Sequence, residues 1–337
     1  MSDLEEGTLS EKTELCSVSV CVPMYNNADT IARCIESILV QRHRDFELLI
    51  VDDGSTDGSV AIASALLRES DRLIVNASRL GLSSNHNKCI ALARGDIVQF
   101  VHGDDRLHPD ALATLLPLFS NPHVGLAFAP RHVDTDDASW LQRYGTLHTN
   151  FGTLTKLNSG ERLVRHLIGE GARENWIGEP TCVMFRRSAA IRVGGFRDDL
   201  YQALDMDLWM KILVDSDAGF HPVGLSTRNH HDGSATKDND ALERQWLDRM
   251  RMLSGMAVDS RAPRQVRAIS IRWWILVWLD RILYTVVRGP DRTHRLAILC
   301  TAPISDFHRS IRRTGVPLSP NKFENNGSHA GRGETWC

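Results

Sequence analysis

The most informative residues of this 337-residue chain are two adjacent acids, Asp104 and Asp105, which follow an apolar run at residues 97–101. The run is rich in β-branched and aromatic side chains and indicates a buried strand. Because neighbouring ionised carboxylates repel each other, a bound cation is the best reason to place them together. A divalent ion binds oxygen ligands and bridges to phosphate. A second acidic strand end, Asp52 and Asp53, lies upstream, so the two pairs outline a nucleotide site.

Each acidic pair also has a simpler interpretation. Asp52 and Asp53 could cap the helix that follows them, and Asp104 and Asp105 could be turn residues before Pro109. The elements around them decide between these interpretations, because only a sheet that brings the strand ends together can form a shared site.

The predicted elements alternate between strands and helices. Strands are predicted at residues 17–22, 46–51, 73–75, 97–101 and 124–129, with helices at 31–39, 59–68, 84–93 and after residue 109. This order predicts an α/β fold with a mostly parallel sheet. Ligands of such sheets bind beyond the carboxyl ends of the strands. We therefore expect residues 23–26, 52–57 and 102–105 to converge.

The pattern is irregular at residues 131–178, and then a strand at 181–186 and a helix at 204–214 are predicted. We expect four segments: a flexible leader (1–15), the main domain (16–236), a C-terminal helical extension (237–315) and a disordered tail (316–337).

Composition excludes several classes of protein. The formal net charge is -3 and no long Lys/Arg block occurs, so nucleic acid is not an expected partner. Seven Cys without a C-x-x-C pair indicate neither a zinc site nor a disulfide framework. The polar N-terminus lacks a signal-peptide core, and no run approaches the ~20 apolar residues that span a bilayer. We expect a cytoplasmic protein.

Six motifs, taken together, resemble the family 2 glycosyltransferases, whose nucleotide-sugar-binding domain has the GT-A fold. Each motif is weak alone, but their order and spacing over about residues 17–236 are specific. They are Val22-Pro-Met-Tyr-Asn26, Val51-Asp-Asp-Gly-Ser-Thr-Asp57, Asn87 with Ala93-Arg-Gly-Asp96, His102-Gly-Asp-Asp105, Gly194-Gly-Phe196 and Asp205-Met-Asp-Leu-Trp209. The resemblance implies a Rossmann-like, mostly parallel sheet flanked by helices, followed here by the helical extension.

The resemblance also implies a role for each matching residue. Asp205 matches the general-base carboxylate, and Asp105 would hold Mg²⁺ or Mn²⁺ on the diphosphate of the donor. Asp53 would contact the nucleobase, normally uracil, and Asp104 would lie beside the ribose and phosphates. The other residues assigned to donor binding are Pro23, Tyr25, Asn26, Asp52 and Asn87.

The chain departs from the family pattern at three places. His102 stands where the family often has the first acid of Asp-x-Asp-Asp, and Leu204 stands where a Glu often precedes the base. The family's Arg-x-His…Ser segment reads Arg228-Asn-His-His-Asp-Gly-Ser234 here, and spacing favours His231 over His230 as a metal ligand.

The implied reaction is inverting, metal-dependent transfer of a sugar from a nucleotide-diphosphate donor, normally UDP-linked, to a hydroxyl of a glycan, polysaccharide or glycolipid. A cation neutralises the charge that builds on the departing diphosphate, and one carboxylate takes the proton of the attacking hydroxyl. A non-catalytic nucleotide-sugar-binding protein is the alternative, and an intact Asp205 argues against it. A nucleotidyltransferase would need a Gly-rich basic loop, which residues 22–26 do not supply.

Several residues keep two interpretations. Asp205 could be an N-cap, and His231 could be a solvated loop residue. Trp209 and Phe196 are interpreted as core residues. Glu179 could contact the acceptor or belong to a surface turn.

Residues 265–288 are apolar, contain Trp273, Trp274 and Trp278, and are flanked by arginines. This pattern is typical of a helix that lies in a membrane interface. Such a helix would deliver the enzyme to lipid-linked acceptors at the inner face of the plasma membrane. The alternative is a helix packed on the catalytic domain or on a second subunit, and the sequence leaves the oligomeric state open.

Overall fold

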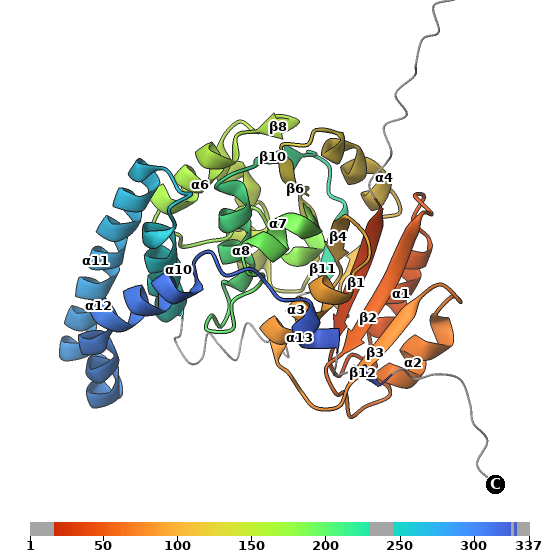
Figure 1. Ribbon diagram of the computed structural model, residues 1–337, viewed down its shortest axis with the longest axis horizontal. Helices are drawn as coiled ribbons and strands as arrows, with labels where there is room; N and C mark the ends of the chain where they lie inside the picture. Colours follow the sequence, from red (N-terminus) through yellow and green to blue (C-terminus); the bar gives the residue numbers. More distant parts are fainter. Residues whose placement is uncertain (1–16, 230–244, 325–326, 329–337) are drawn as a thin grey trace, which may run out of the picture.

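The computed structural model of the chain describes residues 17–229, 245–324 and 327–328 (Figure 1). In this part of the chain a nine-stranded sheet has the order β12-β3-β2-β1-β4-β9-β6-β10-β8. Its strands are β1 (Val18–Met24), β2 (Phe46–Asp52), β3 (Arg72–Asn76), β4 (Ile97–Phe100), β6 (Val124–Phe128), β8 (Leu157–Asn158), β9 (Val183–Arg186), β10 (Asp217–Phe220) and β12 (Gly327–Ser328). A smaller sheet pairs β5 (Arg106–Leu107), β11 (Ser226–Asn229) and β7 (Arg131–Asp134).

The helices lie on both faces of the large sheet. Those of the first two-thirds of the chain are α1 (Ile31–Leu39), α2 (Ser59–Leu66), α3 (Leu82–Leu92), α4 (Ala111–Leu115), α5 (Ala138–Tyr144), α6 (Gly160–Gly169), α7 (Arg187–Arg192) and α8 (Leu204–Leu213). The C-terminal ones are α10 (Gln245–Val258), α11 (Arg264–Val287), α12 (Arg292–Arg313) and α13 (Asn321–Glu324). The prediction of an α/β fold with a C-terminal helical region is confirmed.

Strand pairing explains why the acidic strand ends meet. β1 pairs in parallel with β2 on one side and with β4 on the other, with Met24 opposite Asp52 and Cys21 opposite Phe100. The carboxyl ends of the three strands therefore reach the same edge. β9 runs antiparallel between β4 and β6, so the sheet is mostly but not wholly parallel.

Alternating side chains of the central strands supply two hydrophobic clusters, one on each face of the sheet. Val20 and Val22 join the cluster under α1 and α4, whereas Cys21 joins the cluster under α3 and α8. The helical spacing predicted for α1 is confirmed, because Ile31, Cys34, Ile35 and Ile38 are buried on one face. Each face of the sheet is therefore sealed by helices, and polar residues at the strand ends remain available for a site.

The C-terminal helices α10, α11 and α12 pack together at one end of the molecule, away from β1 to β3 (Figure 1). Trp274 is buried, the indole N–H of Trp273 donates to the carbonyl of Gly169, and that of Trp278 donates to Leu299. The tryptophans predicted to enter a membrane interface therefore hold α11 against α6 and α12. These contacts agree with the alternative interpretation, a helix packed on the catalytic domain.

The chain after α12 returns to the sheet. The amide of Leu318 donates to the carbonyl of Ile191, α13 lies against α3, and β12 pairs antiparallel with β3. These residues therefore have a place in the fold, although the sequence predicts a disordered tail from residue 316. Backbone pairing holds them, and the composition of a Gly/Asn-rich segment does not reveal it. The predicted leader, residues 1–15, lies outside the described residues.

Candidate active site

The loops after β1 and β2 are fastened to each other. The Asn26 amide donates to Ser55 Oγ at 2.9 Å, and Asn26 Oδ1 accepts from the Thr56 amide at 2.9 Å. Asn26 has a φ of 51°, which Asn tolerates better than most residues. Asp52 accepts from the amides of Gly54 and Ser55, so it shapes this loop and does not cap α2.

The loop after β4 reaches the same place. A Cβ on Gly103 would lie 2.6 Å from Asn27 Oδ1, so glycine lets the two loops approach without displacing the Asn27 side chain. The predicted convergence of residues 23–26, 52–57 and 102–105 is thus confirmed. The half-buried Pro23, opposite Val51 in the sheet, lies at the same edge.

Asp53 organises the side of the edge where the nucleobase is predicted to bind. Its carboxylate accepts from the amides of Leu80 and Gly81, at 2.7 and 2.9 Å, and from Asn76 Nδ2 at 3.1 Å. The loop fixed in this way places the Arg79 guanidinium 4.0 Å from the centre of the Tyr25 ring. A flat cationic and aromatic surface therefore stands beside Asp53, and such a surface suits a base.

Asn87 has a structural position. Its Nδ2 donates to the Phe196 carbonyl and its Oδ1 accepts from the Phe196 amide, both at 2.8 Å. Both polar ends of the side chain are engaged by backbone, so Asn87 ties α3 to the Gly194-Gly-Phe196 turn. These contacts give Asn87 a structural role, and its role in donor binding stays a prediction. Trp209 and Phe196 are buried, as predicted for core residues.

Asp105 is buried at the end of β4. Its Oδ2 accepts from Thr181 Oγ1 at 2.6 Å and its Oδ1 from the Asn229 amide at 3.1 Å. Burial, and next the charge of half-buried Asp104, raise the pKa of the Asp105 carboxyl to about 7. Ionisation of Asp105 beside Asp104 is therefore unfavourable unless a cation binds there, and otherwise the Asp105 carboxyl tends to keep its proton.

Two histidines, the half-buried His102 and the buried His86, connect Asp105 to α3. His102 Nδ1 lies 3.7 Å from Asp105 Oδ2, and His102 Nε2 lies 3.1 Å from His86 Nε2. Burial lowers the pKa of both imidazoles, that of His86 to about 3. Next to His86, Asn85 accepts from the same Asn76 Nδ2 that contacts Asp53. Polar residues at the start of α3 thus link the Asp53 side of the site to the Asp105 side.

Glu179 is the residue whose importance the sequence did not reveal. It lies just before the strand β9, where Arg131 Nε is 2.8 Å from its Oε2 and Arg228 Nη1 pairs with its Oε1. Although burial disfavours its charge, the two guanidiniums lower the pKa of Glu179 to about 2. The Trp140 ring lies 5.1 Å from the Arg228 guanidinium carbon. The interpretation of Glu179 as a surface turn is wrong.

Asp205 lies in the first turn of α8, after the N-cap residue Ala203, so it is not itself the N-cap. Its Oδ2 accepts from Asn175 Nδ2 at 3.1 Å and its Oδ1 from the Met206 amide at 2.7 Å. Burial raises the pKa of Asp205 to about 7, and the charge of Glu179 contributes in the same direction. A carboxyl that titrates near neutrality can accept a proton from a hydroxyl.

Contacts around Glu179 connect Asp105 to Asp205. Arg228 pairs with Glu179, and the amide of the next residue, Asn229, donates to Asp105 Oδ1. On the other side, Asn175 Nδ2 donates both to Asp205 Oδ2 and to the carbonyl of Gly178, the residue before Glu179. Arg228 is attracted to Asp105 as well as to Glu179, and it also lowers the pKa of Asp205. The cluster thus combines a carboxylate suited to a cation, a carboxyl suited to a base, and two fixed positive charges.

A divalent cation fits the chemistry of the Asp105 end. Within residues 17–229 and 245–324, no group of three or more His, Cys, Asp or Glu side chains forms a complete metal site. Mg²⁺ is usually bound through one or two carboxylates together with substrate phosphates, and Asp105 and Asp104 supply that kind of donor. The other predicted ligand, His231, lies outside the described residues.

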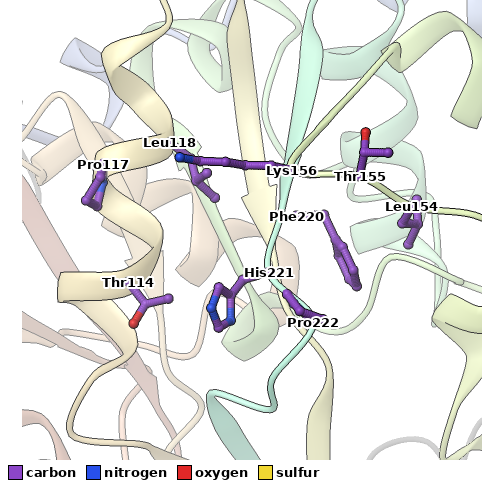
Figure 2. Close-up of a pocket in the computed structure, with 9 residues that line it drawn as sticks. All are labelled: Thr114, Pro117, Leu118, Leu154, Thr155, Lys156, Phe220, His221 and Pro222. Carbon is purple, nitrogen blue, oxygen red and sulfur yellow. The ribbon is translucent and has the colours of Figure 1, made fainter.

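A cavity of about 480 Å³ lies apart from these acids. Leu118 of η1 (Leu116–Ser120), Lys156 and the end of β10 at Phe220 and His221 line it (Figure 2). Its lining includes none of the predicted site residues.

Comparisons with known proteins agree with this architecture. The model of the family described as Glycosyl transferase family 2 matches residues 19–194. The uncharacterized protein MT1568 of Mycobacterium tuberculosis (strain CDC 1551 / Oshkosh) is 49% identical over 88% of this chain and 93% of its own length.

Two solved structures share the fold. The TarS 1-349 structure from S. aureus has a TM-score of 0.64 at 15% identity, over 88% of this chain and 83% of that one. The mannosyltransferase PcManGT from Pyrobaculum calidifontis, in complex with GDP-Man and Mn²⁺, has a TM-score of 0.55 at 17% identity, over 88% and 84%. Because the family model covers more than half of the chain, the protein belongs to glycosyl transferase family 2 and is a glycosyltransferase.

Proposed function

We propose that the protein is an inverting, metal-dependent glycosyltransferase that moves a sugar from a UDP-sugar to a hydroxyl of a glycan, polysaccharide or glycolipid. The observation that carries the proposal is the position of Asp205, which Asn175 and the Met206 amide orient in the same cluster as Asp105. Burial raises the pKa of this carboxyl to about 7. A base that titrates near the working pH is the most effective one.

Two acids of the cluster compete for the role of base, and their surroundings separate them. Glu179 is neutralised by Arg131 and Arg228 and has a pKa of about 2, so it holds a proton poorly. Asp205 is oriented by Asn175, and no arginine of the described residues forms an ion pair with it, although the charge of Arg228 lowers its pKa slightly. We therefore assign proton removal from the acceptor hydroxyl to Asp205. One catalytic carboxylate suffices for direct attack with inversion.

The donor would bind along the edge between Asp53 and Asp105. The Tyr25 and Arg79 surface supports binding of the base there, and Asp105 with Asp104 would hold Mg²⁺ or Mn²⁺ on the diphosphate. The cation would neutralise the charge of the leaving group. A TarS structure contains UDP-GlcNAc, whereas the PcManGT complex contains GDP-Man. We favour UDP because Asp53 matches the family residue that contacts uracil.

A donor screen and one matched variant test this function. Thermal shifts with UDP- and GDP-sugars in Mn²⁺ identify the donor, and nucleotide release then measures turnover. Asp205→Asn should bind the identified donor like the wild type and lose turnover. If the wild type binds donor but turns over none of the acceptor classes and does not hydrolyse it, the non-catalytic binding protein is the better conclusion.

We also propose that the C-terminal helices lie on an anionic membrane. No helix in the described part of the chain is both long and apolar enough to cross a bilayer. Residues 264–313 carry ten Arg and three Asp, a net charge of +7, whereas the whole chain carries -3. Two such surfaces would repel each other, so anionic lipid is a better partner than a second copy.

The surface that would enter the lipid is the outer face of α11, not its tryptophans. Exposed apolar side chains recur every four residues along this face, at Ile271, Ile275, Leu279 and Leu283, with exposed fractions of 42 to 65%. Residues spaced in this way form one stripe on a helix. Binding of this stripe to lipid would bring the active site to a lipid-linked acceptor at the cytoplasmic face of the membrane.

Sedimentation with vesicles tests the membrane proposal. We expect the protein to bind phosphatidylglycerol vesicles and not phosphatidylcholine ones, and a Leu279→Ser/Leu283→Ser variant to stay in the supernatant. Leu157→Ser, at a site that is also 46% exposed but lies on β8, is the matched control and should bind like the wild type. If the wild type, the double variant and Leu157→Ser all sedimented equally with anionic vesicles, the proposal would be contradicted. A concentration-dependent dimer that the double variant does not form would instead show that a second copy of the chain covers this face.

A further inference from the structure

The buried His86 and the half-buried His102, beside Asp105, form a hydrogen-bonded pair whose direction can be deduced. His86 Nδ1 lies 2.8 Å from the carbonyl oxygen of Leu82, which can only accept, so His86 Nδ1 carries a proton. A neutral imidazole has one N–H, so His86 Nε2 carries a lone pair. His102 Nε2, at 3.1 Å, must then be the donor.

This direction leaves the second nitrogen of His102 with a lone pair. His102 Nδ1 lies 3.7 Å from Asp105 Oδ2, so two acceptor atoms lie close together. Thr181 holds them there, because its Oγ1 accepts from the His102 amide at 3.3 Å and donates to Asp105 Oδ2 at 2.6 Å. Two acceptors held in this way repel each other unless something positive lies between them.

We infer that His102 Nδ1 and Asp105 Oδ2 bind the same divalent cation, and that the imidazole makes the site prefer Mn²⁺ to Mg²⁺. The inference rests on the proposed metal-dependent function and goes further by adding a nitrogen ligand. Two ligands about 2.1 Å from an ion are about 3 Å apart at a right angle and about 4.2 Å apart when opposed. The 3.7 Å separation lies between these limits. Imidazole binds Mn²⁺ more readily than it binds Mg²⁺, which prefers oxygen ligands.

His86 is then a positioning residue. A histidine ligand usually gives its other N–H to a fixed acceptor, which sets its tautomer and orientation, and His86 Nε2 is that acceptor. The His86 ring lies 5.0 Å from the Phe100 ring and 5.1 Å from the Phe196 ring, so it is buried among aromatic side chains. The pair His86 and His102 therefore resembles a ligand with its supporting partner.

Electron spin-echo envelope modulation of Mn²⁺ tests the inference without measuring turnover. The full chain is loaded with Mn²⁺ and UDP, and nitrogen bound directly to manganese produces ¹⁴N modulation. We expect modulation in the wild type and a clear loss of its depth in His102→Asn. His231→Asn is measured for comparison, because His231 is the other predicted nitrogen ligand and could also produce ¹⁴N modulation.

The outcomes distinguish a failure of the His102 ligand from a failure of the proposed metal-dependent function. Modulation that is unchanged in His102→Asn, or that disappears in His231→Asn alone, overturns the His102 ligand and leaves the metal-dependent function intact. A Mn²⁺ spectrum that the protein and UDP do not change overturns both. In a second experiment, we expect His102→Asp to lower the ratio of Mn²⁺ to Mg²⁺ affinity by about tenfold, the lower end of the effects that changes around a metal produce. An unchanged ratio would also overturn the inference.

Discussion

Replacing Asp205 with Asn should change how stability depends on pH, as well as remove turnover. Burial raises the pKa of Asp205 from 3.8 to about 7. A shift of about three units at 1.36 kcal/mol each corresponds to about 4 kcal/mol. Because Asp205 is only partly buried by surface area, we reduce this to about 2 kcal/mol for solvent screening.

The sign follows from the raised pKa. A carboxyl with a higher pKa in the folded state favours folding while it is protonated, and this contribution is complete below pH 3.8 and is lost as the pH rises through 7. Asn cannot ionise. The stability of Asp205→Asn relative to the wild type should therefore increase by about 2 kcal/mol between pH 4 and pH 8.

Urea unfolding of both proteins at several pH values measures this difference. The carboxylate accepts from Asn175 and Met206, and Asn has one acceptor oxygen, so a loss of about 1 kcal/mol independent of pH is expected as well. Asp105 also titrates near pH 7, but it is present in both proteins and cancels. A stability difference that stays constant from pH 4 to pH 8 would refute an ionisable, buried Asp205.

Three further substitutions probe the rest of the site. Glu179→Gln should lower the apparent pKa of Asp205 in a pH–rate profile and cost about 3 kcal/mol of stability in urea unfolding, since it removes the carboxylate that the half-buried Arg131 and Arg228 share; an unmoved profile would place Glu179 away from the base. Asp53→Ala should weaken UDP binding by about 1–3 kcal/mol in a calorimetric titration, because it releases the loop that carries Arg79. An unaltered Kd would move the base pocket elsewhere. Asn87→Ala should lower the melting temperature, through two lost hydrogen bonds, without changing the Kd for UDP; weakened UDP binding would restore its donor-binding role.

The sequence predicted the features that follow from local patterns of apolar and polar residues. The acids at the ends of β2 and β4 follow apolar strands directly, and parallel pairing brings those ends to one edge, so the positions of Asp53 and Asp105 could be foreseen. The same holds for the buried face of α1, whose spacing is helical.

The residues that were missed depend on contacts between distant segments. The sequence left Glu179 open between an acceptor contact and a surface turn, because its partner Arg228 is 49 positions away, on a strand that the sequence pattern did not predict. Asn87 was assigned to donor binding only through the family resemblance, and nothing in the sequence indicated that the backbone of Phe196, 109 positions away, engages both ends of its side chain. The apolar circumference of α11 gave no indication of which face packs inward. Only the folded structure shows which distant residues contact Glu179 and Asn87 and which face of α11 is packed.

The most direct measurement is the affinity for UDP, with Mn²⁺ and with chelator, of the wild type, Asp105→Ala and Asp205→Asn. We predict that Mn²⁺ strengthens binding to the wild type and to Asp205→Asn alike, and that Asp105→Ala binds equally weakly in both conditions. If Asp105→Ala kept the full effect of Mn²⁺, the acid at the end of β4 would not hold the cation, and the proposed site would be contradicted.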